Sequence, residues 1–123
     1  MHPDTIDDAP RYAALGSALV LENMDARKRG GRTAVELAPY FAALPQAGFC
    51  FDVAHVASVD PTLAEGERLL DRFGARLRHV HVSSLDEDCH HVALTAGDEE
   101  RFGALLRRCR DVPWILEAPL REL

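Results

Sequence analysis

The chain has 123 residues, of which 47% are hydrophobic and 7% aromatic, and this is enough for a globular domain with its own hydrophobic core. Its formal net charge of −6 argues against broad nucleic-acid binding, because such binding depends on neutralising phosphates with basic residues. No basic, apolar leader and no apolar run of roughly eighteen residues occurs, so the sequence predicts neither secretion nor a membrane span. The three cysteines lie in different segments without C-x-x-C spacing, which is typical of a protein in the reducing cytoplasm rather than of a disulfide framework or a cysteine zinc site.

Short apolar segments alternate with helical segments along the chain. A short helix is expected over residues 8–15, ended by Gly16. Four strand candidates follow, and their ends recur at intervals of about thirty residues, which is the period of a βαβ unit. Near-continuous apolar strands joined by helices predict a parallel sheet covered by helices. The strand candidates are residues 17–22, 48–52, 76–82 and 112–117.

The helices between these strands carry start signals and apolar stripes. Thr33 with Glu36 forms a possible capping box, and Asp60 followed by Pro61 suits the N-cap and first turn of another helix. Apolar residues at i, i+3, i+4 and i+7 predict a stripe that packs on the sheet. The stripes are Leu37, Tyr40, Phe41 and Leu44 in one helix, and Phe102, Leu105, Leu106 and Cys109 in another.

Each predicted strand ends with an ionisable residue. The carboxyl ends of parallel strands meet at one edge, and barrel enzymes place their chemistry there, so this pattern favours a (βα)-barrel over an open doubly wound sheet. Alternation along the strands places a second set of residues on the same inward face. The strand-end residues are Glu22, Asp52, His81 and Glu117, and the second set is Val20, Cys50, His79 and Ile115.

Two glutamates, an aspartate and a histidine at one point favour a divalent cation. Without one, the carboxylates would repel one another and lose their hydration. A donor set rich in oxygen suits Mn2+, Mg2+ or Co2+, whereas additional histidines favour Zn2+. A single carboxylate at a strand end is more often a helix cap or a salt-bridge partner, so the recurrence in four consecutive units carries this hypothesis.

Five segments resemble the strand-end motifs of the xylose isomerase-like TIM-barrel superfamily, which holds sugar isomerases and epimerases together with apurinic/apyrimidinic endonucleases. They are LVLENMD, FCFDVAH, RHVHVSS, DCHH and PWILEAP, in the family's order and spacing over nearly the whole chain. The D-x-x-H formed by Asp52 and His55 is the most specific part. The resemblance implies that Glu22, Asp52, His81 and Glu117 are metal ligands, and that His55 binds substrate or a further metal.

Three more residues take part in the resemblance. Asp88 and His90 in DCHH match the aspartate-x-histidine ligand pair of the nuclease branch, which holds three metal ions. His2 in HPD is similar to the histidine of the His-Pro that ends strand four of these barrels, which implies a further ligand or a substrate contact. The neighbouring His91 is expected to face solvent, and His79 to be a core imidazole.

The resemblance covers the second half of a barrel. A complete barrel needs about 250 residues and eight strands, whereas residues 1–123 match the end of strand four through strand eight. We therefore expect a single partial TIM-barrel domain with about four parallel strands, strands 5 to 8, and covering helices. Such a half-barrel exposes strand edges and inner apolar surface, so it is either a truncated gene product or it associates as a homodimer or with a complementary half-barrel.

Three functions remain open at this point. One is a divalent-metal-dependent isomerase or epimerase of a sugar or sugar phosphate, in which Glu22 and Glu117 transfer a proton at a sugar carbon. Another is a Zn2+-dependent endonuclease at abasic DNA sites, which the acidic net charge disfavours. The third is a catalytically incomplete fragment. The basic loop at residues 27–32 is either solvated surface or a site for a sugar or DNA phosphate.

Overall fold

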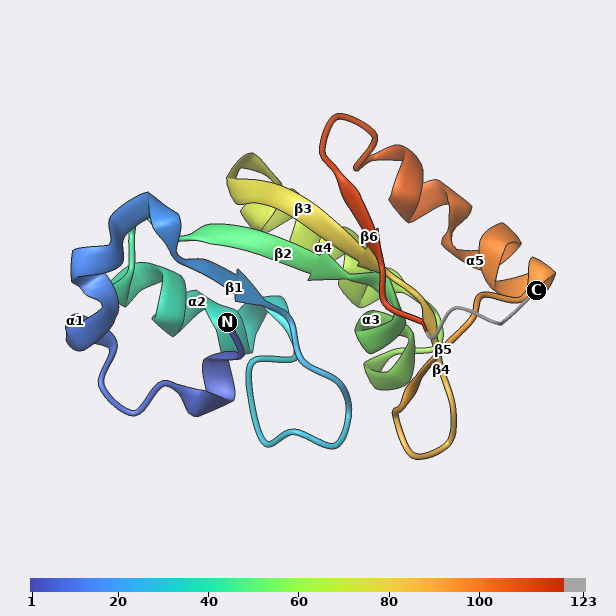
Figure 1. The fold of residues 1–123 in the computed structure, drawn as a ribbon, viewed down its shortest axis with the longest axis horizontal. Helices are drawn as coiled ribbons and strands as arrows, with labels where there is room; N and C mark the ends of the chain where they lie inside the picture. The colour runs from blue at the N-terminus through green and yellow to red at the C-terminus, as the bar shows by residue number, and fades with distance from the viewer. Residues whose placement is uncertain (119–123) are drawn as a thin grey trace.

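The computed structural model describes residues 1–118, and its centre is a parallel sheet. The strands lie in the order β1-β2-β3-β6, so neighbouring strands of the sheet come from successive βα units of the chain (Figure 1). This arrangement is that of a partial TIM barrel, as the sequence predicted. The strands are β1 (Val20–Glu22), β2 (Gly48–Asp52), β3 (Leu77–Val82) and β6 (Trp114–Leu116).

The segment before the sheet differs from the single short helix that we expected. It consists of η1 (Pro3–Thr5), α1 (Ala9–Tyr12) and η2 (Ala13–Ala18), where η denotes a 3-10 helix. Gly16 interrupts η2 with a φ of 53°, a left-handed conformation that glycine adopts without steric cost. This kink delays the start of β1, which is shorter than predicted.

Helices α2 (Ala34–Ala43) and α3 (Val53–Val59) follow the first two strands. The Thr33 hydroxyl accepts a hydrogen bond from the Glu36 N–H, as the predicted capping box requires. The reciprocal half of the box is absent, because the Glu36 carboxylate accepts hydrogen bonds from the backbone and side chain of Arg32 instead.

Helix α4 (Ala64–Phe73) begins later than predicted, and it is followed by η3 (Gly74–Arg76). The carboxylate of Asp60 accepts hydrogen bonds from the N–H groups of Thr62 and Glu65, so it orders the turn before the helix and also satisfies one N–H group of the first turn. Leu63, with a φ of 64°, reverses the chain immediately before α4. Asp60 is therefore not the N-cap of α4.

The hydrophobic core lies between the sheet and the helices, which include α5 (Ala96–Arg107). Strand residues that point toward the helices, such as Leu21, Phe51 and Val80, are completely buried. Phe49 packs its ring against those of Phe41 and Phe73, with centroid separations of 6.0 and 6.1 Å. The predicted helix stripes supply the opposite side of this core. Within residues 1–118, no helix has the length and apolar character needed to cross a membrane.

Strand β6 is the exception, because all three of its residues are exposed. Trp114 is 47% and Leu116 71% exposed on the side that faces α5, and Ile115 is 45% exposed on the inner face. Between β3 and α5 the chain forms an antiparallel pair that the sequence did not predict, β4 (Ser84–Leu85) with β5 (His91–Val92). Two-residue strands are too short to show a hydrophobic period.

Candidate metal centre

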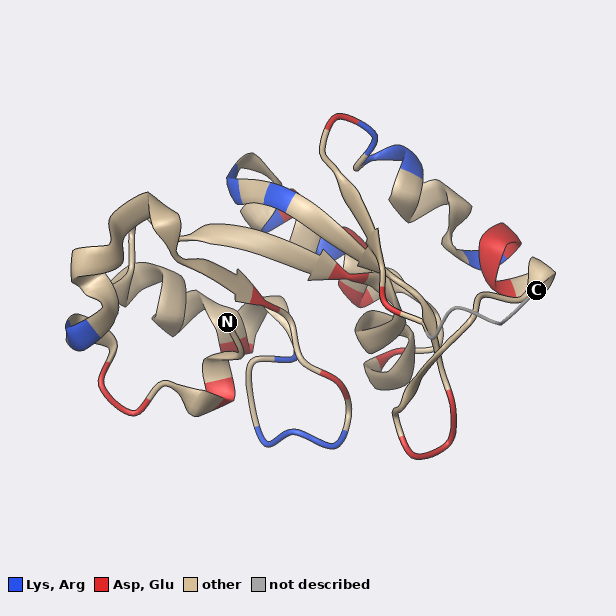
Figure 2. Cartoon of the chain, in the orientation of Figure 1, with Lys and Arg blue, Asp and Glu red and all other residues tan. Residues whose placement is uncertain are grey.

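Four predicted side chains meet at the carboxyl ends of the strands. Glu22 ends β1, Asp52 ends β2, His81 lies in β3 opposite Asp52, and Glu117 directly follows β6. One ligand atom from each of the four lies within 4.8 Å of those of the others. Figure 2 shows acidic residues at the tips of β1 and β2 in the middle of the molecule. The structure thus brings together the whole set that the strand ends predicted.

A single imidazole nitrogen faces the three carboxylates of this group. His81 Nδ1 is 3.1 Å from Glu22 Oε1, 3.0 Å from Glu117 Oε1 and 3.9 Å from Asp52 Oδ2. Burial alone raises the pKa of Glu22, but the His81 hydrogen bond and the nearby imidazoles outweigh it and lower this pKa to about 2. Burial likewise disfavours the charged form of His81, but Glu22 and Glu117 raise the pKa of this residue above its usual value.

Asp52 has one oxygen paired and the other unpaired. Its side chain is fully buried, and Oδ1 accepts the His55 N–H at 2.9 Å, which caps α3. Oδ2 is buried without a hydrogen-bond partner among the described residues. Burial and the negative charges of Glu22 and Glu117 raise the pKa of Asp52 well above its usual range. An orphaned carboxylate oxygen beside two more carboxylates fits a divalent cation, since such buried groups otherwise require a donor.

Asn23 holds the ends of β1 and β2 together, and sequence reasoning did not single it out. Its Nδ2 donates to the Asp52 carbonyl at 3.0 Å, and its Oδ1 accepts from the Asp52 N–H at 2.8 Å. The side chain thereby replaces one residue of a strand ladder and fixes the backbone of Asp52. In the sequence, the feature that could have pointed to Asn23 is its position as a polar residue directly after the strand-end Glu22.

His55 is oriented by the same asparagine. Its Nδ1 is 2.7 Å from the Asn23 carbonyl oxygen, which can only accept, so Nδ1 carries the proton. Nε2 is then free of hydrogen and lies 3.5 Å from Asp52 Oδ2. Burial lowers the pKa of His55, which favours the neutral ring. A neutral imidazole whose one N–H is fixed by a carbonyl, with its other nitrogen free, has the arrangement of a metal-ligating histidine.

His91 joins this second group, contrary to the expectation that it faces solvent. Ligand atoms of Asp52, His55 and His91 lie within 4.8 Å of one another, and the two rings are 5.2 Å apart. Ser83 Oγ is 2.7 Å from His91 Nδ1, and Glu117 Oε2 is 3.3 Å from His91 Nε2. The pairing of β4 with β5 produces this placement.

Asp88 and His90 lie elsewhere than His91. With Asp86 they form an exposed group in the turn between β4 and β5. The His90 side chain is 69% exposed and its Nδ1 lies 3.3 Å from Asp86 Oδ2, although the residue also lines the cleft beside Glu22. The structure therefore does not bring Asp88 and His90 to the strand-end group.

The N-terminal residues complete one side of the site. The Met1 amino group donates to the Val20 carbonyl at 2.6 Å, and the Glu22 N–H donates to the Met1 carbonyl at 3.1 Å, so the chain runs beside β1. His2 Nε2 consequently lies 3.1 Å from Glu22 Oε2. A cleft of about 530 Å3 opens above the group, and its lining includes His2, His55, His91, Arg27, Lys28 and Glu117.

Parallel βα units with ionisable residues grouped at the carboxyl ends of their strands define the chain as part of a TIM barrel. The family model of the xylose isomerase-like TIM barrel matches residues 6–122, and the chain belongs to this family. The family includes sugar isomerases and epimerases as well as apurinic/apyrimidinic endonucleases. No curated protein and no solved structure gives a significant match. The resemblance seen in the strand-end motifs is confirmed.

Proposed function

We propose that the protein is a divalent-metal-dependent isomerase or epimerase of a sugar or sugar phosphate. The observation that carries this proposal is the Glu22, Asp52, His81 and Glu117 group with the unpartnered Oδ2 of Asp52 in it. Three carboxylates and one imidazole favour Mn2+, Mg2+ or Co2+ as the ion that they hold. A bound divalent ion polarises a carbonyl and a hydroxyl of the sugar.

Glu22 and Glu117 are the residues that move the proton. Their Oε1 atoms both approach His81 Nδ1, so the two carboxylates stand on either side of one ring nitrogen. Glu22 is ionised at neutral pH, because its pKa is about 2, and it accepts a proton from a sugar carbon. Glu117, with 31% of its side chain exposed toward the cleft, returns a proton.

The basic loop after β1 supports a phosphorylated substrate. Arg27 and Lys28 line the same cleft as Glu22 and Glu117. Figure 2 shows basic residues along the outer part of this loop, which leaves the acidic tip of β1. Arg27 is 53% exposed in its side chain and pairs with Asp25, and Lys28 pairs with Asp4 at 3.4 Å. Lys28 can exchange its partly exposed pair with Asp4 for a phosphate at little cost, whereas the partner of Arg27, Asp25, is buried.

Solvent deuterium incorporation into a panel of ketoses and ketose phosphates tests the proton transfer. With Mn2+ or Co2+ added, the wild-type protein should exchange a carbon-bound proton, and Glu22→Gln and Glu117→Gln should each abolish the exchange, because they keep the shape and remove the base. Glu87→Gln, in the exposed turn between β4 and β5, is the matched control and should exchange normally. Equal incorporation by all four proteins would remove these glutamates from the mechanism.

An abasic-site endonuclease is the second candidate, and the Asp52, His55 and His91 group favours it. Two imidazoles beside a carboxylate suit Zn2+, and ions held by this group and by the strand-end group would supply charge stabilisation for the cleavage of a phosphodiester. Nicking of an oligonucleotide with one abasic site, lost in His91→Ala and absent on intact DNA, would support it. The net charge of −6 is the argument against.

We also propose that the chain associates, as a homodimer or with a complementary half-barrel. Trp114, Ile115 and Leu116 expose apolar surface on both faces of β6. At roughly 25 cal/mol per Å2, covering a few hundred Å2 of it contributes several kcal/mol. Light scattering should give a mass above that of one chain, and Leu116→Glu should lower it. A monodisperse monomer in the wild-type protein contradicts the association.

A further inference from the structure

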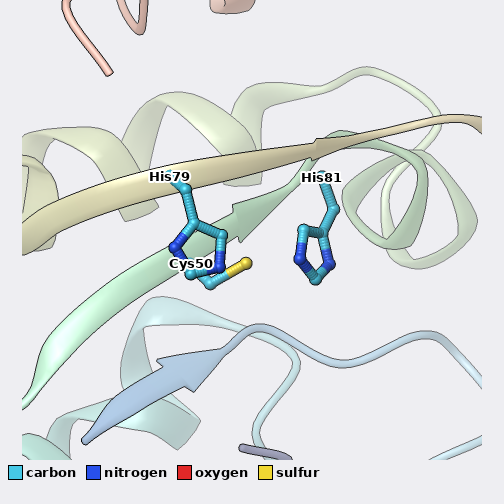
Figure 3. Close-up of side chains that lie close together, drawn as sticks. All are labelled: Cys50, His79 and His81. Atoms are coloured by element: carbon cyan, nitrogen blue, oxygen red, sulfur yellow. The ribbon is translucent and has the colours of Figure 1, made fainter. Parts of the chain in front are cut away.

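The inner face of the sheet carries a group of nitrogen and sulfur donors one layer below the carboxylates. Ligand atoms of Cys50, His79 and His81 lie within 4.8 Å of one another. Figure 3 shows the Cys50 sulfur between the two imidazole rings, with the histidines on one strand and the cysteine on the next. The group differs from the strand-end site in chemistry, since a thiol and two imidazoles replace the carboxylates.

Strand pairing brings these three residues together. Cys50 in β2 is the direct partner of His79 in β3, and side chains that are paired in adjacent parallel strands lie on the same face. His81 follows His79 by two residues and therefore shares that face. The two rings are 5.2 Å apart and inclined by 37°. The backbone of a regular sheet, not a loop, fixes the three donors.

The donor atoms of this group are free of other partners. Within residues 1–118, ring hydrogen bonds are made by His55, His81, His90 and His91, and none by His79. Among the described residues, the thiol that donates a hydrogen bond is that of Cys109, and the Cys50 thiol makes none. His81 uses Nδ1 toward Glu22 and Glu117, which leaves Nε2 for the inner group.

We propose that Cys50, His79 and His81 Nε2 bind Zn2+ at an inner site, separate from the strand-end carboxylates. One thiolate and two imidazoles form a donor set for a borderline-soft ion, and they disfavour Mg2+ and Mn2+. Binding replaces the thiol proton of Cys50 by a sulfur–zinc bond and displaces any proton on His81 Nε2, and these protons leave to solvent. Three protein ligands leave one coordination position open, as in sites where zinc takes water or substrate. His81 Nε2 is free to bind when Nδ1 carries the proton, so the inner site competes for His81 with a strand-end metal that takes Nδ1.

Cobalt is the spectroscopic probe for the inner site, because thiolate ligation of Co2+ produces charge-transfer absorption in the near ultraviolet. The full chain is stripped of metal with a chelator and titrated with Co2+. We expect the band in the wild-type protein, its loss in Cys50→Ser, and its displacement by added Zn2+. Cys109→Ser and Cys89→Ser are matched controls that retain the band, since neither thiol belongs to the inner group.

Two further variants separate this site from the proposed function. His79→Ala should weaken Co2+ binding, read from the band, by at least about tenfold, because it removes a ligand. Glu87→Gln, in the exposed turn between β4 and β5, should leave the band unchanged, because Glu87 belongs to neither group. Far-ultraviolet circular dichroism checks folding, and if Cys50→Ser does not fold, the His79→Ala titration decides. A wild-type protein without the band, a band that survives in Cys50→Ser, or unchanged affinity in His79→Ala overturns the inner site.

Discussion

The two faces of the sheet differ in what each contributes. On the outer face, Leu21, Phe51 and Val80 are fully buried and apolar, and their partners are helices of the same chain. On the inner face, the alternate positions of the same strands hold Asp52 and His79 among other ionisable groups. The outer face therefore supplies the stability, whereas the inner face holds ionisable donor atoms, including the Asp52 Oδ2 that has no hydrogen-bond partner among the described residues. Four experiments test this contrast.

The largest expected effect is on the outer face. Phe49 is completely buried against Phe41 and Phe73, so Phe49→Ala should lower the free energy of unfolding by about 3–5 kcal/mol through lost contacts and a cavity. Urea unfolding followed by circular dichroism measures it. Ile115→Ala, on the half-exposed inner face of β6, is the control and should cost less than about 1.5 kcal/mol. Equal losses in both variants would show that the faces do not differ.

The next effect is an acid dependence that comes from Glu22. Its pKa falls from 4.5 to about 2 on folding, so its contribution is present above pH 4.5 and is lost as the pH falls toward 2. At about 1.4 kcal/mol per pH unit, this contribution is roughly 3 kcal/mol. In chelator, the difference in unfolding free energy between wild type and Glu22→Gln should shrink across that window. The exposed variant Glu87→Gln should run parallel to wild type, and parallel curves for Glu22→Gln would refute the expectation.

Removal of the charge on Asp52 should stabilise the metal-free chain. The raised pKa of Asp52 means that its ionisation at neutral pH opposes folding, because burial and the neighbouring carboxylates disfavour the charge. Asp52→Asn should add about 0.5–2 kcal/mol in chelator and remove any stabilisation by Mn2+ or Co2+. Thermal melts with and without metal measure both. Asp88→Asn, in the exposed turn, should change neither, and a less stable metal-free Asp52→Asn protein would contradict the argument.

The smallest expected effect belongs to His79. Its ring is partly exposed and makes no hydrogen bond within residues 1–118, so His79→Ala should change the metal-free unfolding free energy by no more than about 0.5 kcal/mol. The same urea titration measures it. A loss comparable to that of Phe49→Ala would mean that the inner face also carries a core.

The strand-end site was accessible from the sequence, whereas its supporting contacts were not. Glu22, Asp52, His81 and Glu117 follow apolar runs at a regular period, and parallel strands of one sheet must bring such ends together. The role of Asn23 depends on a contact across two strands, which no local pattern encodes.

Two further features, the start of α4 and the position of His91, lie elsewhere than the local sequence predicts. Asp60 and Pro61 have the composition of a helix start, but the left-handed Leu63 moves the start of α4 to Ala64. His91 reaches the site because β4 and β5 pair, and strands of two residues leave no periodic trace in a sequence.

The order β1-β2-β3-β6 has a consequence for how the chain folds. Within the described sheet, each strand after β1 pairs with the strand of the preceding βα unit. Its partner has therefore already been synthesised when it leaves the ribosome. During translation, β1, β2 and β3 can assemble with α2, α3 and α4 before β6 leaves the ribosome. We expect β6, whose three residues are all exposed, to dock last onto β3 and to be the first strand to detach when the protein unfolds.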